Sequence, residues 1–225
     1  MQHAKLCLVT ACLLATGTSR LAAQGFQGVI QFVSYERDSN EPDTMTQITK
    51  GSKIRFEGMG HQGGAMIMDG TNRLILMPDK KQYMNLPVDF GGREAAAEAA
   101  KHRGTAEKTG KTENVAGIPC EDWHYKGTDE DGKSEEGEVC MAKGAGLMIN
   151  RLSGGITAHM FDAGGQAFND AINAGGGIMK VTNNGKVVLV AIRAQASTIP
   201  DAMFAPPPDY TALTMPTGMG RPHKP

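Results

Sequence analysis

Two cysteines in the middle of the chain, Cys120 and Cys140, are the side chains with the clearest chemical potential. Cysteine pairs form disulfides in oxidising compartments and bind zinc in suitable four-ligand clusters. A zinc site is disfavoured here, because neither cysteine belongs to a C-x-x-C pair and no histidine pair lies nearby. The sequence therefore predicts a disulfide that closes a loop of about 20 residues and stabilises the fold by about 3 kcal/mol. Two separate buried thiols are the alternative.

A group of methionine and histidine side chains could bind a soft metal ion. Met59 and His61, followed by Met66 and Met68, offer thioether and imidazole ligands of the kind that suits Cu(I). Methionine is also a flexible apolar filler that lines adaptable hydrophobic pockets. Met66 and Met68 would share one face of a strand, which favours the apolar interpretation. Copper binding is kept as an alternative function.

Sequence motifs for catalysis are missing from the chain. It contains no G-x-S-x-G, no HExxH, no phosphate-binding loop and no dinucleotide fingerprint. The acidic segment 129–138 resembles an EF-hand loop only in part, because Gly127 would stand at the first ligand position. An acidic hairpin turn is the better interpretation. We therefore expect a protein that is not an enzyme and uses no cofactor.

Residues 1–24 have the layout of a secretory signal peptide. Lys5 precedes the uncharged apolar run Leu6–Ala15, and small residues lead to a cleavage site near Ala23. Lipidation at Cys12 is an alternative, but it would leave an unusually short leader. Cleavage would remove two of the four cysteines, so the remaining pair would reach an oxidising compartment together. The prediction is a periplasmic or secreted protein.

Length, charge and composition exclude several classes of protein. The 225 residues suffice for one domain with a real core. A net charge of -1 is too neutral for a nucleic-acid binder that neutralises phosphates, and a hydrophobic content of 40% is too high for a disordered chain. Apart from the leader, no stretch approaches the ~18 apolar residues of a transmembrane helix.

Short alternating segments predict a series of strands that would position these groups. Strand patterns occupy residues 25–36, 53–57, 66–68, 74–77, 82–86, 105–126, 138–141, 177–182 and 186–196. The turn Asn184-Gly185 is the strongest hairpin signal. Helices are expected over residues 93–103 and 161–173. The expected fold is α+β, with a curved antiparallel sheet wrapped over two or so helices in a single domain, residues 25–205, followed by a proline-rich tail, 206–225.

Two segments resemble an uncharacterised family of exported bacterial proteins with a domain of unknown function. They are the run Thr109–Trp123 (TGKTENVAGIPCEDW) and the run Gly137–Gly144 (GEVCMAKG). The ending Ile199–Tyr210 (IPDAMFAPPPDY) is similar to the closing element of the lipoprotein-carrier (LolA/LolB-like) superfamily. That resemblance implies an unclosed half-barrel of antiparallel strands over helices, enclosing an apolar cavity that binds acyl chains.

These observations predict an exported, non-catalytic binding protein for a lipid or another hydrophobic ligand. Its partners would be a lipid or an acylated protein, and not nucleic acid. The candidate cavity residues come from the alternating strands and are Ile30, Phe32, Ile54, Phe56, Met66, Met68, Leu76, Met84 and Trp123. Complete packing of these side chains into a core without a cavity is the competing interpretation. The alternative function is a cell-envelope interaction module that binds a protein partner through a strand edge or the tail.

Overall fold

The computed structural model describes residues 25–35, 41–59, 64–70, 72–86, 104–128, 133–147 and 165–213. This part of the chain forms twelve strands, one α-helix and two short 3-10 helices. The strands are β1 (Gly28–Ser34), β2 (Asp43–Lys50), β3 (Lys53–Met59), β4 (Gly64–Asp69), β5 (Asn72–Met77), β6 (Gln82–Leu86), β7 (Thr105–Val115), β8 (Ile118–Thr128), β9 (Ser134–Lys143), β10 (Gly176–Asn183), β11 (Lys186–Ala196) and β12 (Thr211–Leu213). The helices are α3 (Gly165–Asn173), η1 (Pro78–Lys80) and η4 (Asp201–Phe204).

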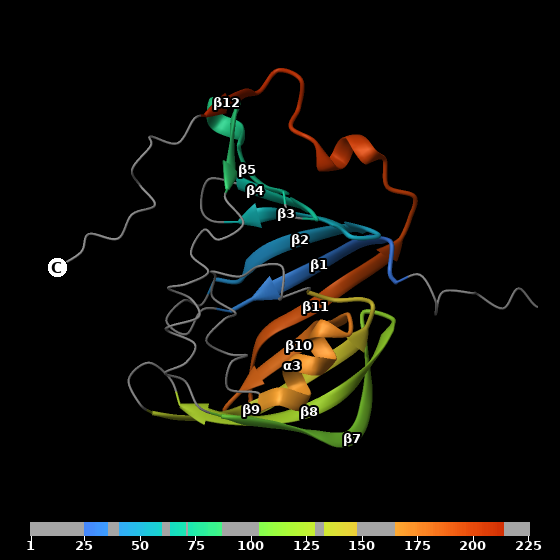
Figure 1. Ribbon diagram of the computed structural model, residues 1–225. Coiled ribbons are helices and arrows are strands. Elements are labelled where there is room, and N and C mark those ends of the chain that lie inside the picture. Colours follow the sequence, from blue (N-terminus) through green and yellow to red (C-terminus); the bar gives the residue numbers. More distant parts are fainter. Residues whose placement is uncertain are drawn as a thin grey trace, which may run out of the picture.

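All twelve strands belong to one open sheet, in the order β12-β6-β5-β4-β3-β2-β1-β11-β10-β9-β8-β7 (Figure 1). Every neighbouring pair is antiparallel except β12 and β6, which run parallel. Most neighbours in the sheet are also neighbours in the chain, as expected for a meander of hairpins. The main exception is β1, which joins the two halves by pairing with both β2 and β11.

The expected α+β fold with two or so helices is therefore wrong. The described residues are nearly all strand and form a single open sheet, with α3 as their one α-helix. Helix 161–173 is confirmed from Gly165 onward, whereas the predicted helix 93–103 lies outside the described residues. Strand β2 was not predicted, because threonines occupy positions where a strand pattern would show apolar side chains. Threonine is β-branched and favours strands as valine does.

Alternation of side chains makes the strands two-faced. In β3, Ile54 and Phe56 are buried on one face, while the polar Arg55 projects from the other. The hairpin from β10 to β11 turns at Asn184 and Gly185, whose φ angles are 49° and 78°. Positive φ at both positions is the signature of the twisted turn that the Asn-Gly pair favours, so this predicted hairpin is confirmed.

Two clusters of buried apolar residues hold the sheet. The larger one gathers side chains of β1, β3, β4 and β7–β11 with Phe168 and Ile172 of α3. Within it, the rings of Phe168 and Trp123 meet edge to face, with centroids 5.4 Å apart. In Figure 1, α3 lies across the half of the sheet that contains β8, β9 and β10. This helix therefore fixes that half of the sheet.

The smaller cluster lies under the segment that follows β11, residues 197–210, here called the strap. Ile199 and Phe204 of the strap are each 6% exposed and pack with Ile48, Ile67 and Leu76. Ion pairs hold the polar ends of the strap, and they are Lys50–Asp201, Lys53–Asp201 and Lys81–Asp209. The chain then continues into β12, which lies inside the predicted irregular tail. The strap thus covers one face of β2–β5.

Candidate functional site

The first candidate site is an apolar row that crosses the sheet on the face of Ile54 and Phe56. Strand register places Met84, Ile75, Met66, Phe56, Gln47 and Ile30 directly opposite one another across β6, β5, β4, β3, β2 and β1. Directly opposed residues of antiparallel strands project to the same face. A parallel row beside it contains Leu86, Arg73, Met68 and Ile54. We call the side chains of Phe56, Met66, Met68, Ile75 and Met84 the methionine face.

Burial decreases along this row from β1 toward β6. Ile30 and Phe56 are fully buried, and Met68 of the neighbouring row is 2% exposed. Met66, Ile75 and Met84, farther along, are only partly buried. The inner part of the row is therefore packed core, and its outer part is apolar surface that still meets solvent.

The predicted cavity residues do not all share this face. Ile30, Phe32, Ile54, Phe56 and Met68 are buried members of the larger cluster together with Trp123, and Met66 packs against that cluster. Met84 joins them through its register with Ile75. Leu76 lies on the opposite face, in the smaller cluster under the strap. The reason is the two-residue period of β5, which points Leu76 away from its neighbour Ile75.

Arg73 brings a positive charge to the apolar surface. It lies opposite Met68 on one side and Leu86 on the other, so its side chain projects on the same face as Ile75 two residues later. It is partly buried, and among the described residues no hydrogen bond or ion pair engages its guanidinium group. Arginine in such surroundings is well suited to bind a carboxylate or phosphate through two parallel hydrogen bonds.

The copper alternative gains little from the structure. Met66 and Met68 share a face, as predicted, but Met68 is only 2% exposed within the apolar core. His61 lies outside the described residues, and so the imidazole of the proposed ligand set has no described position. Apolar packing explains the thioethers of Met66 and Met68.

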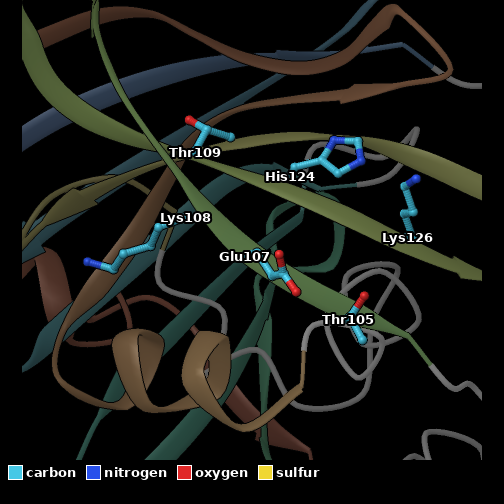
Figure 2. Close-up of a pocket in the computed structure, with 6 residues that line it drawn as sticks. All are labelled: Thr105, Glu107, Lys108, Thr109, His124 and Lys126. Carbon is cyan, nitrogen blue, oxygen red and sulfur yellow. The ribbon is translucent and has the colours of Figure 1, made fainter.

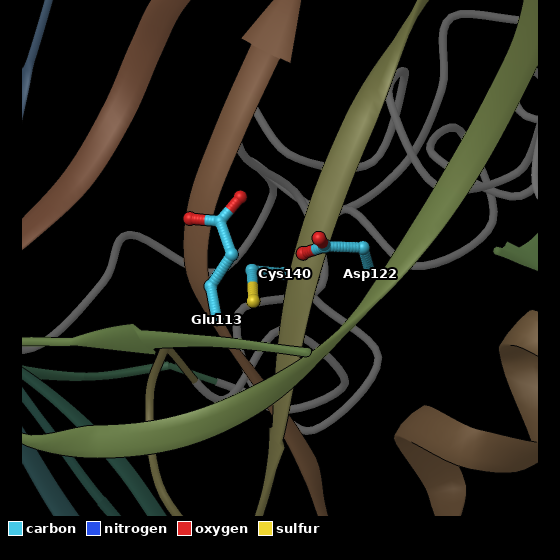
Figure 3. A group of neighbouring side chains, drawn as sticks. All are labelled: Glu113, Asp122 and Cys140. Atoms are coloured by element: carbon cyan, nitrogen blue, oxygen red, sulfur yellow. The ribbon is translucent and has the colours of Figure 1, made fainter. Parts of the chain in front are cut away.

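The second candidate site surrounds the disulfide between Cys120 and Cys140, which confirms the predicted pairing. Cys140 of β9 lies opposite Asp122 of β8 and Lys180 of β10. Glu113 of β7 lies opposite Cys120. Oxygen atoms of Glu113 and Asp122 and the Sγ of Cys140 lie within 4.8 Å of one another (Figure 3). The next row, Trp123–Val139–Val181, points to the opposite face, toward α3.

The charges of this cluster are unevenly compensated. Lys180 donates hydrogen bonds of 2.7 and 2.6 Å to the two carboxylate oxygens of Glu113. Asp122 is only 4% exposed, and in the described chain its carboxyl group has no hydrogen-bond partner. Burial raises the pKa of Asp122 above its usual range, and the nearby carboxylates of Glu113 and Glu138 raise it further.

A third feature is a polar pocket of about 460 Å³ on β7 and β8 (Figure 2). It is lined by Thr105, Glu107, Lys108, Thr109, His124 and Lys126. Its cations already have partners, because Lys108 pairs with Glu121 at 2.7 Å and Lys126 pairs with Glu136 at 3.5 Å. Lys108 also lies 5.2 Å from the centroid of the Trp123 ring. These interactions account for the side chains as surface pairs, and we assign the pocket no chemistry.

Four residues of these sites were not predicted from the sequence: Arg73, Glu113, Asp122 and Lys180. The last three lie on three different strands, and only the register of β7–β10 brings them to the disulfide. A signal was available for Asp122, since it stands two residues after Cys120 and must share its face in a strand. No such local signal existed for Lys180, which is 40 residues from Cys140.

Comparisons with known proteins identify the family. A family model described as a domain of unknown function, DUF4412, matches residues 26–210. No curated protein matches the chain. A solved structure, that of an uncharacterized conserved protein from Thermus thermophilus, is similar at 10% identity with a TM-score of 0.43, over 83% of this chain and 90% of that one. That likeness is too weak to support an argument about function. In the part of the chain that the structure describes, no helix has the length and apolarity needed to span a membrane. Because the family model covers residues 26–210, the chain belongs to the DUF4412 family.

Proposed function

We propose that this chain is an exported, non-catalytic binding protein that holds the acyl chain of an anionic amphiphile against the methionine face. One observation carries the proposal: the apolar row continues from the buried core to the partly exposed Met66, Ile75 and Met84. An acyl chain laid along this surface would extend the packing that the core has begun. Each buried methylene contributes about 0.8 kcal/mol.

The chemical character of the surface suits such a ligand. Methionine side chains are unbranched and polarisable, so they adapt to chains of different length and curvature. Arg73 lies at the margin of the methionine face and would bind a carboxylate or phosphate head group. A ligand with both features, an apolar chain and an anionic head, would use the two together.

Export is part of the proposal. The leader-like residues 1–24 and the Cys120–Cys140 disulfide both suit an oxidising compartment such as the periplasm. The resemblance of the ending Ile199–Tyr210 to the lipoprotein carriers favours an acylated partner over a small apolar metabolite.

Extraction of the native protein tests whether a lipid is bound. The protein is purified from its exporting host without detergent, extracted with organic solvent and examined by mass spectrometry. We expect an anionic lipid near one per chain. Protein that carries none, and that gains none when it is incubated with vesicles of an anionic phospholipid, would rule the proposal out.

Titration with cis-parinaric acid, a fluorescent fatty acid, tests the site itself. Met84→Asp places a charge on the partly exposed apolar surface and should abolish binding. Arg73→Met keeps the apolar contact but removes the cation. We expect it to lower the affinity for the acid about 10-fold and to leave the affinity for its methyl ester unchanged. Arg193→Met, at an exposed position of β11, is the matched control, and it should change the affinity for neither the acid nor the ester. Equal affinities in the Arg73 and Arg193 variants would remove the head-group assignment.

An interaction module is the second candidate, favoured by the open edges of the sheet. β7 is an 11-residue edge strand with one side unpaired by the other described strands. Such an edge can accept an extended segment of a partner, although charged side chains such as Lys108 and Lys111 also protect edges from chance pairing. A photo-crosslinking residue at Lys111, compared with one at the exposed Asn72 that begins β5, would reveal an edge-specific envelope partner.

A further inference from the structure

We propose that reduction of the Cys120–Cys140 disulfide creates a zinc site, whose four ligands are the two cysteine thiolates and the carboxylates of Asp122 and Glu113. The two cysteines alone lack the four ligands that a structural zinc ion needs. The fold supplies the missing pair from β7 and β8. This proposal is independent of the proposed lipid binding.

The geometry suits a tetrahedral ion. Zinc binds thiolates at about 2.3 Å and carboxylates at about 2.0–2.2 Å, so its ligand atoms lie about 3.3–3.8 Å from one another. Oxygens of Glu113 and Asp122 and the Sγ of Cys140 already lie within 4.8 Å of one another. The Cα atoms of the two cysteines are 5.4 Å apart, close enough for both sulfurs to reach one ion by side-chain rotation. The backbone therefore needs little rearrangement.

The state of Asp122 is the independent observation that points to a ligand. The residue is 4% exposed and has no side-chain hydrogen bond in the described chain, although buried polar groups normally have a partner. Figure 3 shows its carboxylate directed toward Cys140 and Glu113. The nearest ammonium group, that of Lys180, is bonded to Glu113 and not to Asp122, so a metal ion between the Asp122 carboxylate and the sulfur would give this carboxylate a cation of its own.

Lys180 explains why the oxidised protein does not need the metal and why the reduced one would accept it. With the disulfide intact, the cluster holds two carboxylates and one ammonium group, which is bonded to Glu113. Two thiolates would add two negative charges, which Zn²⁺ compensates. Glu113 can give one oxygen to the ion and keep the other on Lys180, an outer contact of the kind that orients metal ligands.

The chemical step is balanced with a dithiol as the reductant. The dithiol donates two electrons and two protons to the Cys120–Cys140 bond and becomes a disulfide itself. Zn²⁺ then forms two bonds to sulfur, and the two thiol protons pass to water. Reoxidation of the cysteines would break both bonds and release the ion.

Cobalt and zinc titrations of the purified protein test the site. The protein is reduced with a dithiol, exchanged into oxygen-free buffer and titrated with Co²⁺, whose thiolate charge-transfer and visible bands report sulfur ligands in tetrahedral geometry. We expect one ion per reduced chain with both signals, displacement of Co²⁺ by Zn²⁺, and no such bands from the oxidised protein. Absence of the bands in the reduced protein, or equal binding by the oxidised protein, would overturn the proposal.

Two variants separate the four-ligand site from a simple thiol pair. Asp122→Asn should weaken Zn²⁺ binding by more than about 10-fold, since even the loss of an outer-shell partner costs 10–100-fold. Glu121→Gln, at the adjacent position on the other face of β8, is the matched control and should bind as the parent does. Equal affinities in the two variants would refute the role of Asp122. If the reduced chain unfolds, circular dichroism decides: refolding by zinc in the parent but not in Asp122→Asn supports the site, and no refolding in either refutes it.

Discussion

Removal of the cross-link by the double substitution Cys120→Ala and Cys140→Ala should lower the free energy of unfolding by about 3 kcal/mol. The disulfide joins residues separated by 20 positions. In the chain-entropy model, closure of such a loop removes about 11 cal/mol/K from the unfolded chain, which is about 3.3 kcal/mol at 25 °C. The antiparallel pairing of β8 with β9 already aligns the two positions, so the folded strands can keep their register without the bond.

Urea denaturation followed by tryptophan fluorescence measures this difference, because the chain's one tryptophan, Trp123, is buried between β8 and α3. For a slope of about 2 kcal/mol/M, the midpoint should fall by about 1.5 M. Parent protein reduced in the presence of a metal chelator is the control, since it loses the bond but keeps both sulfur atoms. If the free energy of unfolding falls by less than about 1 kcal/mol in both the double variant and the reduced parent, the loop-closure argument is refuted.

Three further changes test the packing and the electrostatics of the fold. Phe204→Ala removes the buried aromatic ring that packs the strap onto the sheet. We expect the free energy of unfolding, measured by chemical denaturation, to fall by about 3 kcal/mol, and proteolysis after β11 to become faster. Gly137→Ala would place its Cβ 1.9 Å from the carbonyl oxygen of Thr182, a backbone atom that cannot move aside. We therefore expect the free energy of unfolding to fall by about 3 kcal/mol in chemical denaturation, or the purified variant to be unfolded. The pKa of Asp122 is raised in the folded protein, so the folded state binds the carboxyl proton more tightly than the unfolded state does. The contribution of Asp122 to the free energy of unfolding is therefore greatest below the usual aspartate pKa. It is lost as the pH rises through the raised pKa. Asp122→Asn should therefore remove that decline in a series of urea midpoints from pH 3 to pH 8, and an unchanged pH profile would show that the buried carboxyl group is not its source.

Local patterns in the sequence predicted most of the strands. The alternation in Lys53–Glu57 and the Asn184-Gly185 turn depend on neighbours in the chain, and both appear in the structure as expected. Strand β2 was missed because its inward positions include Gln47 and Thr49, which are 1% and 4% exposed. Gln47 satisfies its amide by donating to Thr49 and to the carbonyl oxygen of Gly146, 99 residues away. A buried polar residue of this kind has no recognisable pattern, because its partner comes from elsewhere in the fold.

The candidate sites were predictable to the extent that they depend on one strand. The shared face of Met66 and Met68 follows from a spacing of two, and the disulfide was predicted from the two cysteines that lie outside the predicted leader. The opposite orientation of Leu76 depends on where β5 begins its alternation, which the short apolar run 74–77 does not reveal. The gathering of Glu113 and Lys180 at the disulfide requires the order of four strands. That order is a property of the whole sheet.

The two proposed sites lie far enough apart to act separately. The methionine face centres on β4–β6 and the disulfide cluster on β8–β10, and eight strand spacings of about 4.8 Å, roughly 38 Å along the sheet, separate β6 from β9. Substitutions at such distances normally have additive effects unless a shared element connects them. One candidate connection is β1, whose Ile30 and Phe32 belong to the same buried cluster as Met68 and Cys140. If the reduced, zinc-bound protein binds parinaric acid with unchanged affinity, the two sites are independent. A change in affinity would instead show that the shared buried cluster couples them, and substitution of Ile30 or Phe32 would then test whether β1 carries the coupling.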